Sequence, residues 1–343
     1  MITVFSEKHR LRDAKTELAG GVLVRPFECP ERAEIIHDRV QAVGLGDVIA
    51  PTEHPLSSIL TIHDPDFVRF LQTCWDDWKA DGHAGEAIAS TWPGRTMRAG
   101  RVPNNIDGKI GYYAMAAETA ISDGTWQAVK ASADVALTAV DHVIGGARSA
   151  FALCRPPGHH AASDLFGGYC FVNNAAIAAQ KARDAGVERV AILDVDFHHG
   201  NGTQAIFYDR GDVLFTSIHG DPRDAFPYFL GFDDETGTGE GEGCNLNIPL
   251  PPGTPYATWA NGLEQALDKI TQYAPGLLII SLGVDTFALD PISFFKLQSD
   301  DFTDMGQRIE ALGLPTLFVM EGGYAVAEIG VNAVNVLTGF EGR

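Results

Sequence analysis

Short apolar runs rich in β-branched residues recur along the 343-residue chain, with segments of helical periodicity between them. Runs that are apolar on both faces, without alternation, are typical of buried parallel strands. The expected strands are Ile2–Phe5, Ala150–Cys154, Val190–Asp194, Val213–Ile218, Leu277–Leu282 and Thr316–Met320. The expected helices lie near residues 31–43, 65–78, 127–144, 172–185, 255–273, 301–312 and 327–337. Alternating strands and helices predict an α/β fold, with a mainly parallel, multi-stranded sheet and helices on both faces.

No internal repeat and no Pro-rich or Ser-rich linker divides the chain, so residues 1–343 are expected to form a single domain. Residues 79–111 interrupt the pattern, because they are rich in Gly, Pro and charge and show little periodicity. Loops of this length inside a compact domain are usually functional or disordered. The stretch is therefore predicted to be a long insertion.

The formal net charge of −20 makes nucleic acid and anionic membranes poor partners. Solubility explains such a charge, and attraction of a small cationic substrate is the second interpretation. No apolar run reaches the roughly 18 residues that a membrane span needs, and the N-terminus lacks the pattern of a signal peptide. Five scattered cysteines without a C-x-x-C pair indicate a reducing compartment and argue against thiolate metal sites. A cytoplasmic location is therefore expected.

Titratable side chains follow four of the expected strands at the point where each strand ends. The four ends read RPPGHH at 155–160, DVDFHHG at 194–200, GVD at 283–285 and EGGY at 321–324. Ligands of open parallel sheets bind outside the carboxyl ends of the strands, and buried charges there need partners that offset their desolvation. The four ends are therefore predicted to form one site.

The second of these strand ends has the composition of a metal site. Asp194, Asp196 and His198 share one face of the chain if the extended geometry continues beyond the strand. Asp196 and His198 offer one oxygen and one nitrogen, and Asp285 supplies a second carboxylate from another strand end. Two aspartates and a histidine leave a coordination position for water, as a catalytic zinc site requires. The sequence thus predicts one catalytic divalent ion per chain.

Acid–base groups lie at two further strand ends. A site with two carboxylate ligands needs a separate base, because the carboxylates cancel the charge of the ion. His159 and His160 are available, and the preceding Pro-Pro pair stiffens their approach. Tyr324 follows a Gly-Gly pair, and its phenol can donate a hydrogen bond to a developing oxyanion. A metal, a base and a donor together indicate a hydrolase.

Five motifs carry a resemblance to a known family: CRPPGHH, GGYCFVNN, ILDVDFHHGNGT, SLGVDTF and MEGGY. From about residue 150 to its end, the chain resembles the zinc-dependent histone deacetylase family, which has the arginase-deacetylase fold. The N-terminal part, with TELAGG, IDGKIGYY and AAETAI, is similar to the bacterial acetylpolyamine amidohydrolases of that family. The resemblance implies a metal-dependent amidohydrolase that releases acetate and free polyamine from N-acetylated polyamines.

The resemblance implies roles for residues at the strand ends. His160 would be the general base and acid, His159 a charged partner oriented by Asp194, and Tyr324 the donor to the carbonyl. One position departs from many family members, which have an aspartate where this chain has Asn201. An amide still accepts a hydrogen bond from His160 but cannot stabilise an imidazolium by charge. His160 is therefore expected to stay neutral near pH 7.

The resemblance also implies ions, a substrate tunnel and an assembly. The implied zinc ligands are Asp196, His198 and Asp285, with iron(II) as the alternative ion. The implied ligands of a structural potassium ion are Asp194, Asp196, His198, Ser217 and Ile218. The implied substrate-binding residues are Gly168, Tyr169 and Phe226 along the tunnel, with Glu17, Asp107 and Glu118 facing the substrate cation. The insertion at 79–111 would join two subunits into a homodimer and narrow the entrance.

Three other functions stay open at this point. A protein-lysine deacetylase shares the chemistry but needs an accessible rim, which the insertion would block. An arginase-like two-metal ureohydrolase needs more carboxylates, and position 287 is Phe rather than Asp. A metal-dependent binding or sensor protein is disfavoured by the intact set of ligands, base and donor.

Overall fold

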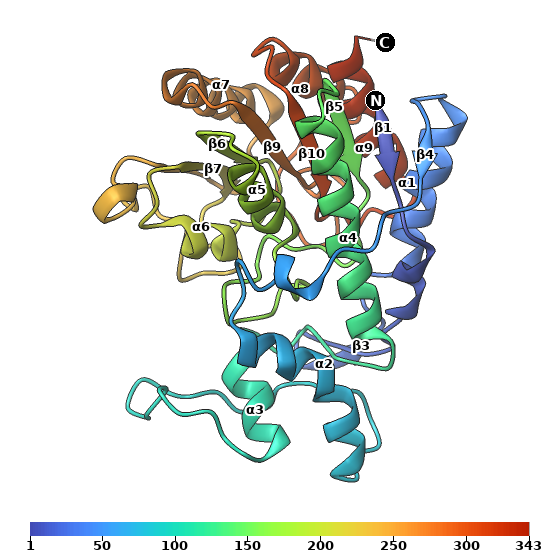
Figure 1. The fold of residues 1–343 in the computed structure, drawn as a ribbon, viewed down its shortest axis with the longest axis vertical. Coiled ribbons are helices and arrows are strands. Elements are labelled where there is room, and N and C mark those ends of the chain that lie inside the picture. The colour runs from blue at the N-terminus through green and yellow to red at the C-terminus, as the bar shows by residue number, and fades with distance from the viewer. Residues whose placement is uncertain (343) are drawn as a thin grey trace.

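An eight-stranded parallel sheet forms the centre of the computed structural model, which describes residues 1–342 (Figure 1). The strands are β1 Ile2–Val4, β4 Val48–Ile49, β5 Ser149–Ala152, β6 Val190–Asp194, β7 Val213–Gly220, β8 Asn245–Leu250, β9 Leu277–Leu282 and β10 Thr316–Met320. They lie in the order β4-β1-β5-β10-β9-β6-β7-β8, and every neighbouring pair is parallel. The predicted α/β fold is confirmed.

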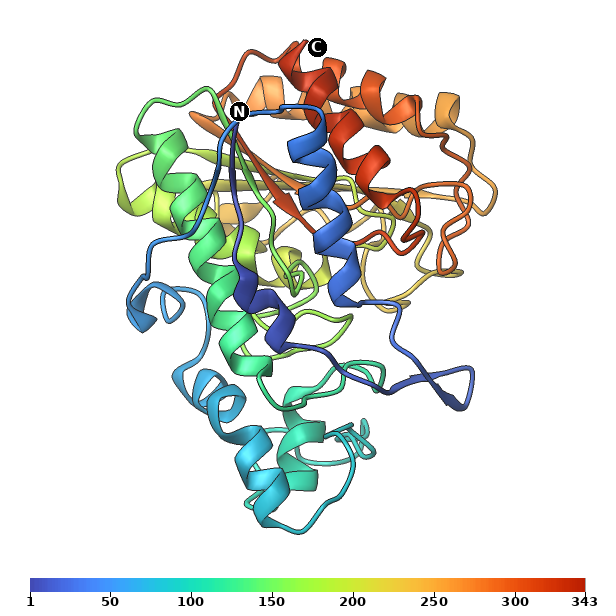
Figure 2. The ribbon, with the colours of Figure 1, turned by 90° about the vertical axis from the view of Figure 1, so that its right-hand side faces the viewer.

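Helices cover both faces of this sheet (Figures 1 and 2). They are α1 Pro30–Ala42, α2 Pro65–Ala80, α3 Ile106–Tyr113, α4 Thr125–Ile144, α5 Asn174–Asp184, α6 Asn201–Phe207, α7 Tyr256–Tyr273, α8 Asp301–Glu310 and α9 Ile329–Glu341. Successive strand residues point to opposite faces, so Leu193 of β6 packs in one apolar core and Ile192 in the other. The first core includes α1, α7, α8 and α9, and the second includes α4 and α5. Within residues 1–342, no helix is both long and apolar enough to cross a membrane.

All six expected strands are present, and β6, β9 and β10 have the expected bounds. The expectation missed β8, because Asn245, Asn247 and Pro249 interrupt its apolar run. β8 lies at the edge of the sheet, where a strand can contain proline. It also missed the hairpin of β2 Glu17–Ala19 and β3 Val22–Val24, whose two-residue turn has positive φ at Gly20 and Gly21.

Residues 79–111 are only partly irregular. Helix α2 continues to Ala80, and α3 begins at Ile106, with Asn105 accepting a hydrogen bond from the backbone N–H of Asp107. A third apolar core packs α2 and α3 together at the end of the molecule remote from the C-terminus (Figure 2). The interpretation of this stretch as an insertion stays a prediction.

A buried carboxylate, Glu28, connects the N-terminal part of the chain to the strand ends. Arg155 donates to it through Nε and Nη2 over 2.7 and 3.1 Å, and Arg32 donates through Nη1 over 3.1 Å. Nε of Arg12 lies 3.7 Å from Glu28 Oε2. Burial by itself would raise the pKa of Glu28, but the three arginines lower it below its usual value.

Arg32 carries this network to the segment that follows β10. Its guanidinium donates to the backbone oxygens of Glu321 and Gly323, each over 2.6 Å. The same guanidinium lies over the ring of Tyr324, with 4.8 Å between its carbon and the ring centroid. Glu28 therefore orders the segment that places Tyr324.

Replacing Glu28 with alanine is expected to lower the free energy of unfolding by about 3–5 kcal/mol, because three buried guanidinium groups lose their shared counter-charge. Urea denaturation measures the loss. The matched control is Glu310→Ala, which removes an ion pair with Arg148 whose side chains are 45% and 54% exposed. The control should lose at most about 1 kcal/mol. Equal losses in both variants would contradict the role given to Glu28.

Candidate active site

The four strand ends with titratable residues meet at one edge of the sheet. Strands β5, β10, β9 and β6 are consecutive neighbours and run in parallel, so their carboxyl ends lie side by side. The register places Asp194 of β6 beside Ser281 of β9, and Met320 of β10 beside Leu282 of β9. The segments that follow these strands therefore converge, as the pattern of the sequence predicts.

Asp196, His198 and Asp285 form a buried group in which one ligand atom of each lies within 4.8 Å of the others. The backbone N–H of Phe197 donates to Asp285 Oδ1 over 2.7 Å, and that of Gly322 donates to Asp196 Oδ2 over 2.8 Å. A Cβ atom at Gly322 would lie 2.5 Å from Oδ2 of both aspartates. The spacing and the donor types fit one divalent cation.

The imidazole of His198 lies against both carboxylates of this group. His198 Nδ1 lies 3.1 Å from Asp285 Oδ2 and 3.3 Å from Asp196 Oδ1. Burial by itself would lower the pKa of His198, but these hydrogen bonds raise it to about 10. Burial and the charge of Asp196 raise the pKa of Asp285 to about 7. A cation that binds here must therefore displace a proton.

Asp194 faces a different partner. The extended geometry ends at Asp194, and residues 196–198 form a bend, so the condition for a shared face with Asp196 and His198 is not met. Oδ2 of Asp194 instead pairs with Nδ1 of His159 at 2.9 Å, and Oδ1 accepts the backbone N–H of Asp196. Asp194 thus fixes the ring of His159, which is the arrangement that the resemblance implies.

The surroundings of His159 and His160 shift their pKa values in opposite directions, although the two residues are adjacent in the chain. Burial by itself would lower the pKa of His159, but Asp196 and Asp194 raise it to about 10. His160 Nδ1 lies 2.6 Å from Asn201 Oδ1, which can only accept, so Nδ1 carries the proton and Nε2 is free. Burial and the charge of His159 lower the pKa of His160 well below its usual value. The lowered pKa favours a neutral His160 near pH 7, the form that a general base requires.

A cavity of about 250 Å³ opens onto these residues. His160, His198 and Tyr324 line it, together with the predicted tunnel residues Gly168, Tyr169 and Phe226. At Gly168 a Cβ atom would lie 2.2 Å from Cδ2 of His160, so only glycine lets this wall approach the base. The sequence reasoning missed the further apolar wall of Ile292, Phe294 and Tyr228.

Two carboxylates line this cavity. Glu118 was expected there, and its Oε1 accepts the backbone N–H of Gly168 over 2.7 Å. Asp224 was missed, because it lies in the turn after β7, the strand whose end carries the least distinctive sequence. The neighbouring Arg223 binds Asp221 through Nε over 2.9 and 3.1 Å, and no such contact to Asp224 occurs within residues 1–342. The carboxylate of Asp224 is therefore exposed at the cavity and available to a cationic substrate group.

The other two expected recognition carboxylates lie elsewhere. Glu17 is buried behind the cavity wall, where it accepts a hydrogen bond from the hydroxyl of Tyr169 over 2.8 Å. Asp107 belongs to a partly exposed group on the α2–α3 region with Asp81 and His83. Its Oδ1 lies 3.6 Å from His83 Nε2, and it does not line the cavity of its own chain.

A family model described as histone deacetylase domain matches residues 26–340. The chain belongs to the histone deacetylase family. The predicted resemblance is thereby confirmed, and membership of this family makes the chain a hydrolytic deacetylase.

Two curated relatives match over the full length of the chain. The chain is 56% identical over 342 residues to the acetylpolyamine amidohydrolase of Mycoplana ramosa, and the aligned region covers 100% of both proteins. It is 58% identical over 342 residues to acetylpolyamine amidohydrolase 2 of Pseudomonas aeruginosa, covering 100% of this chain and 99% of the relative. The crystal structure of acetylpolyamine aminohydrolase from Burkholderia pseudomallei superposes with a TM-score of 0.94 at 40% identity, covering 99% and 98% of the two chains.

The affinity for Zn²⁺ is expected to rise by about tenfold per pH unit between the pKa values of Asp285 and His198, about 7 and about 10. The reason is that one bound proton must leave when the cation binds. Calorimetric titration in buffers of different ionisation enthalpy measures the protons released.

The surface group gives the control for this measurement. His83→Ala should leave the stoichiometry and the proton release unchanged, whereas Asp285→Ala should abolish both. Zinc binding that depends on His83, or that releases no proton, would contradict the prediction.

Proposed function

We propose that this deacetylase hydrolyses the amide bond of N-acetylated polyamines and releases acetate and the free polyamine. The observation that carries the proposal is the full-length match, at 56% and 58% identity, to two proteins named for that reaction. A protein-lysine deacetylase is not favoured, because the resemblance to acetylpolyamine amidohydrolases extends through the N-terminal third as well as the family motifs.

We propose one zinc ion per chain, held by Asp196, His198 and Asp285, with iron(II) as the alternative ion. When bound, a divalent ion acts as a Lewis acid toward the amide carbonyl and acidifies water. The proposed residues of a structural potassium site are Asp194, Asp196, His198, Ser217 and Ile218. Their support is that Asp194 lies opposite Ser217 in the register of β6 and β7, in a fully buried part of the sheet.

His160 is the proposed acid–base residue. Its free Nε2 accepts a proton from the attacking water as the new C–O bond forms. The phenol of Tyr324 donates a hydrogen bond to the carbonyl oxygen, and burial keeps it protonated by raising its pKa well above the usual value. His160 then passes its proton to the departing nitrogen when the C–N bond breaks. The charge of His159, held by Asp194, stays in place through both transfers.

We propose that carboxylates at the cavity recognise the distant ammonium of the substrate. Glu118 and Asp224 line the cavity of a single chain. Asp107 would reach a cavity only from a neighbouring subunit, in a homodimer formed through residues 79–111. Support for that dimer is the exposure of two apolar side chains of this stretch, Met97 at 65% and Val102 at 44%.

A cytoplasmic location is the last part of the proposal. All five cysteines are free within residues 1–342, which is ordinary for a reducing compartment.

Tyr324→Phe should lower kcat by about 10²–10³, the effect of losing one donor to a developing oxyanion. Zinc content and thermal stability should stay close to the wild-type values, because the phenol oxygen of Tyr324 makes no hydrogen bond within residues 1–342 and its ring contact with Arg32 is kept. Steady-state kinetics with elemental analysis measures both. Near-normal turnover would mean that another residue is the donor.

Wild-type kcat/KM should be higher on acetylputrescine, acetylcadaverine or acetylspermidine than on an acetyl-lysine peptide. Glu118→Gln and Asp224→Asn should each lower kcat/KM on the acetylated polyamines by about fivefold or more, and far less on an uncharged N-alkylacetamide. Asp107→Asn should show the same selectivity if a second subunit covers the mouth.

The control for these variants is Asp233→Asn, an exposed carboxylate outside the cavity, which should leave both substrates unaffected. Equal losses on charged and uncharged substrates would assign the carboxylates a structural role. A preference for the peptide would instead favour the protein-lysine deacetylase.

A further inference from the structure

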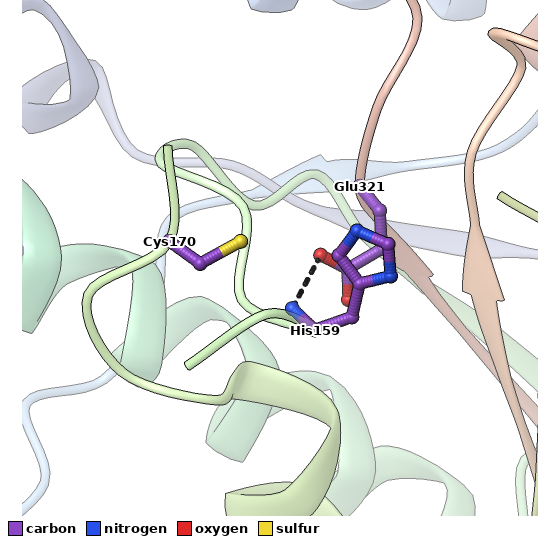
Figure 3. A group of neighbouring side chains, drawn as sticks. All are labelled: His159, Cys170 and Glu321. Atoms are coloured by element: carbon purple, nitrogen blue, oxygen red, sulfur yellow. Dashed lines mark hydrogen bonds between the residues drawn. The ribbon is translucent and has the colours of Figure 1, made fainter. Parts of the chain in front are cut away.

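Glu321, the residue that directly follows β10, is a fully buried carboxyl group that the mechanism above does not use. Its Oε2 accepts the backbone N–H of Gly158 over 2.7 Å and that of His159 over 3.2 Å. Figure 3 shows the hydrogen bond from the backbone of His159 to this carboxyl group, with the sulfur of Cys170 directed toward the pair. Oε1 has no hydrogen-bond partner in the part of the chain that the structure describes.

This arrangement does not fit a second metal site, although the three side chains lie close enough for one. Burial raises the pKa of Cys170 well above its usual value, so its sulfur is a thiol rather than a thiolate ligand. Oε2 of Glu321 is already occupied by two backbone donors, and Nδ1 of His159 by Asp194. The carboxyl group of Glu321 is therefore a hydrogen-bond acceptor for the backbone rather than a metal ligand.

Two backbone hydrogen bonds fix the position of Glu321. Its own N–H donates to the carbonyl oxygen of Leu282 over 2.9 Å, and its carbonyl oxygen accepts from Arg32 over 2.6 Å. Burying a carboxyl group costs free energy unless its partners offset it, and the side chain gains only two backbone donors. A group held this rigidly can set the place of whatever it binds.

The side chain of Glu321 binds the backbone of Gly158 and His159, directly before His160. This loop is closely packed at Gly158, since a Cβ atom there would lie 2.5 Å from the backbone nitrogen of Asn174. Tyr324 lies three residues after Glu321 on the same segment. The side chain of Glu321 thus joins the segment of the oxyanion donor to the loop of the base.

We propose that Glu321 is a positioning residue, which fixes His159 and His160 relative to Tyr324 so that base and donor act on one carbonyl group. The inference rests on the proposed function. Without the acceptor, two buried N–H groups lose their partner and the loop shifts to find another. A displacement of about 1 Å at a catalytic group can lower the rate about 10²-fold.

Two neutral substitutions of similar size separate the acceptor from the charge. Glu321→Gln retains an oxygen that can accept both N–H groups, whereas Glu321→Met does not. Burial raises the pKa of Glu321 to about 7, so an uncharged side chain is compatible with this place. Glu321→Met is expected to lower kcat by about 10–100-fold with KM within about twofold, and Glu321→Gln to recover most of the loss.

The matched control is Glu341→Met, which removes a partly buried carboxylate at the amino ends of the strands, where it accepts from the N-terminal amine and Ser149. Its unfolding midpoint should fall, and its kcat should not. Equal kcat values in Glu321→Met and Glu321→Gln would overturn the proposal, whether both are normal or both are low. If Glu321→Met does not fold, Glu321→Asp withdraws the acceptor by one methylene, and a wild-type kcat there would also overturn it.

The comparison is made on any acetylated amide that the wild type hydrolyses. Wild-type protein that turns over only an acetyl-lysine peptide would refute the proposed substrate, yet the same variants would still test Glu321.

Discussion

The burial of four carboxyl groups at one edge of the sheet is the constraint on which the rest of the structure depends. They belong to Asp194, Asp196, Asp285 and Glu321, all 0% exposed. An isolated carboxylate in such a place would take up a proton rather than stay charged. One of the four faces a protonated histidine, one accepts two backbone hydrogen bonds, and two share the imidazole of His198. The parallel sheet makes this possible, because it brings the residues that follow four strands to the same place.

The same constraint gives the two adjacent imidazoles, His159 and His160, different pKa values. His159 has a carboxylate partner and a raised pKa, whereas His160 has the amide of Asn201 and a lowered pKa. The backbone alone could not produce this difference, because both side chains leave one loop and are equally buried. Two carboxylates, Asp196 and Asp194, favour the charged form of His159, whereas burial and the charge of His159 favour the neutral form of His160, the form that can act as a base.

The fold and much of the site could be predicted because their signals are local. Apolar runs locate β6, β9 and β10 to the residue, and the polar residues after them identify where the strands end. β8 has no such signal, since Asn245 and Asn247 become buried only through hydrogen bonds to residues distant in sequence. Asp224 was missed for a similar reason, as an ordinary turn residue becomes part of a cavity only through tertiary packing. The motif at 321–324 was noticed for its tyrosine, while the neighbouring contact made by Glu321 depends on a loop over 160 residues away.

The place of β10 in the sheet has a consequence for how the chain becomes an enzyme. β10 is the last strand in sequence, yet it lies between β5 and β9 near the middle of the sheet. A growing chain can pair β6 with β7 early, but the sheet stays split until residues 316–320 have been synthesised. Pairing of strands so distant in sequence is slow, because the chain loses the entropy of closing a long loop before the stabilising contacts form. Until then the unpaired edges of β5 and β9 are surfaces that a chaperone, or another unfinished chain, can bind.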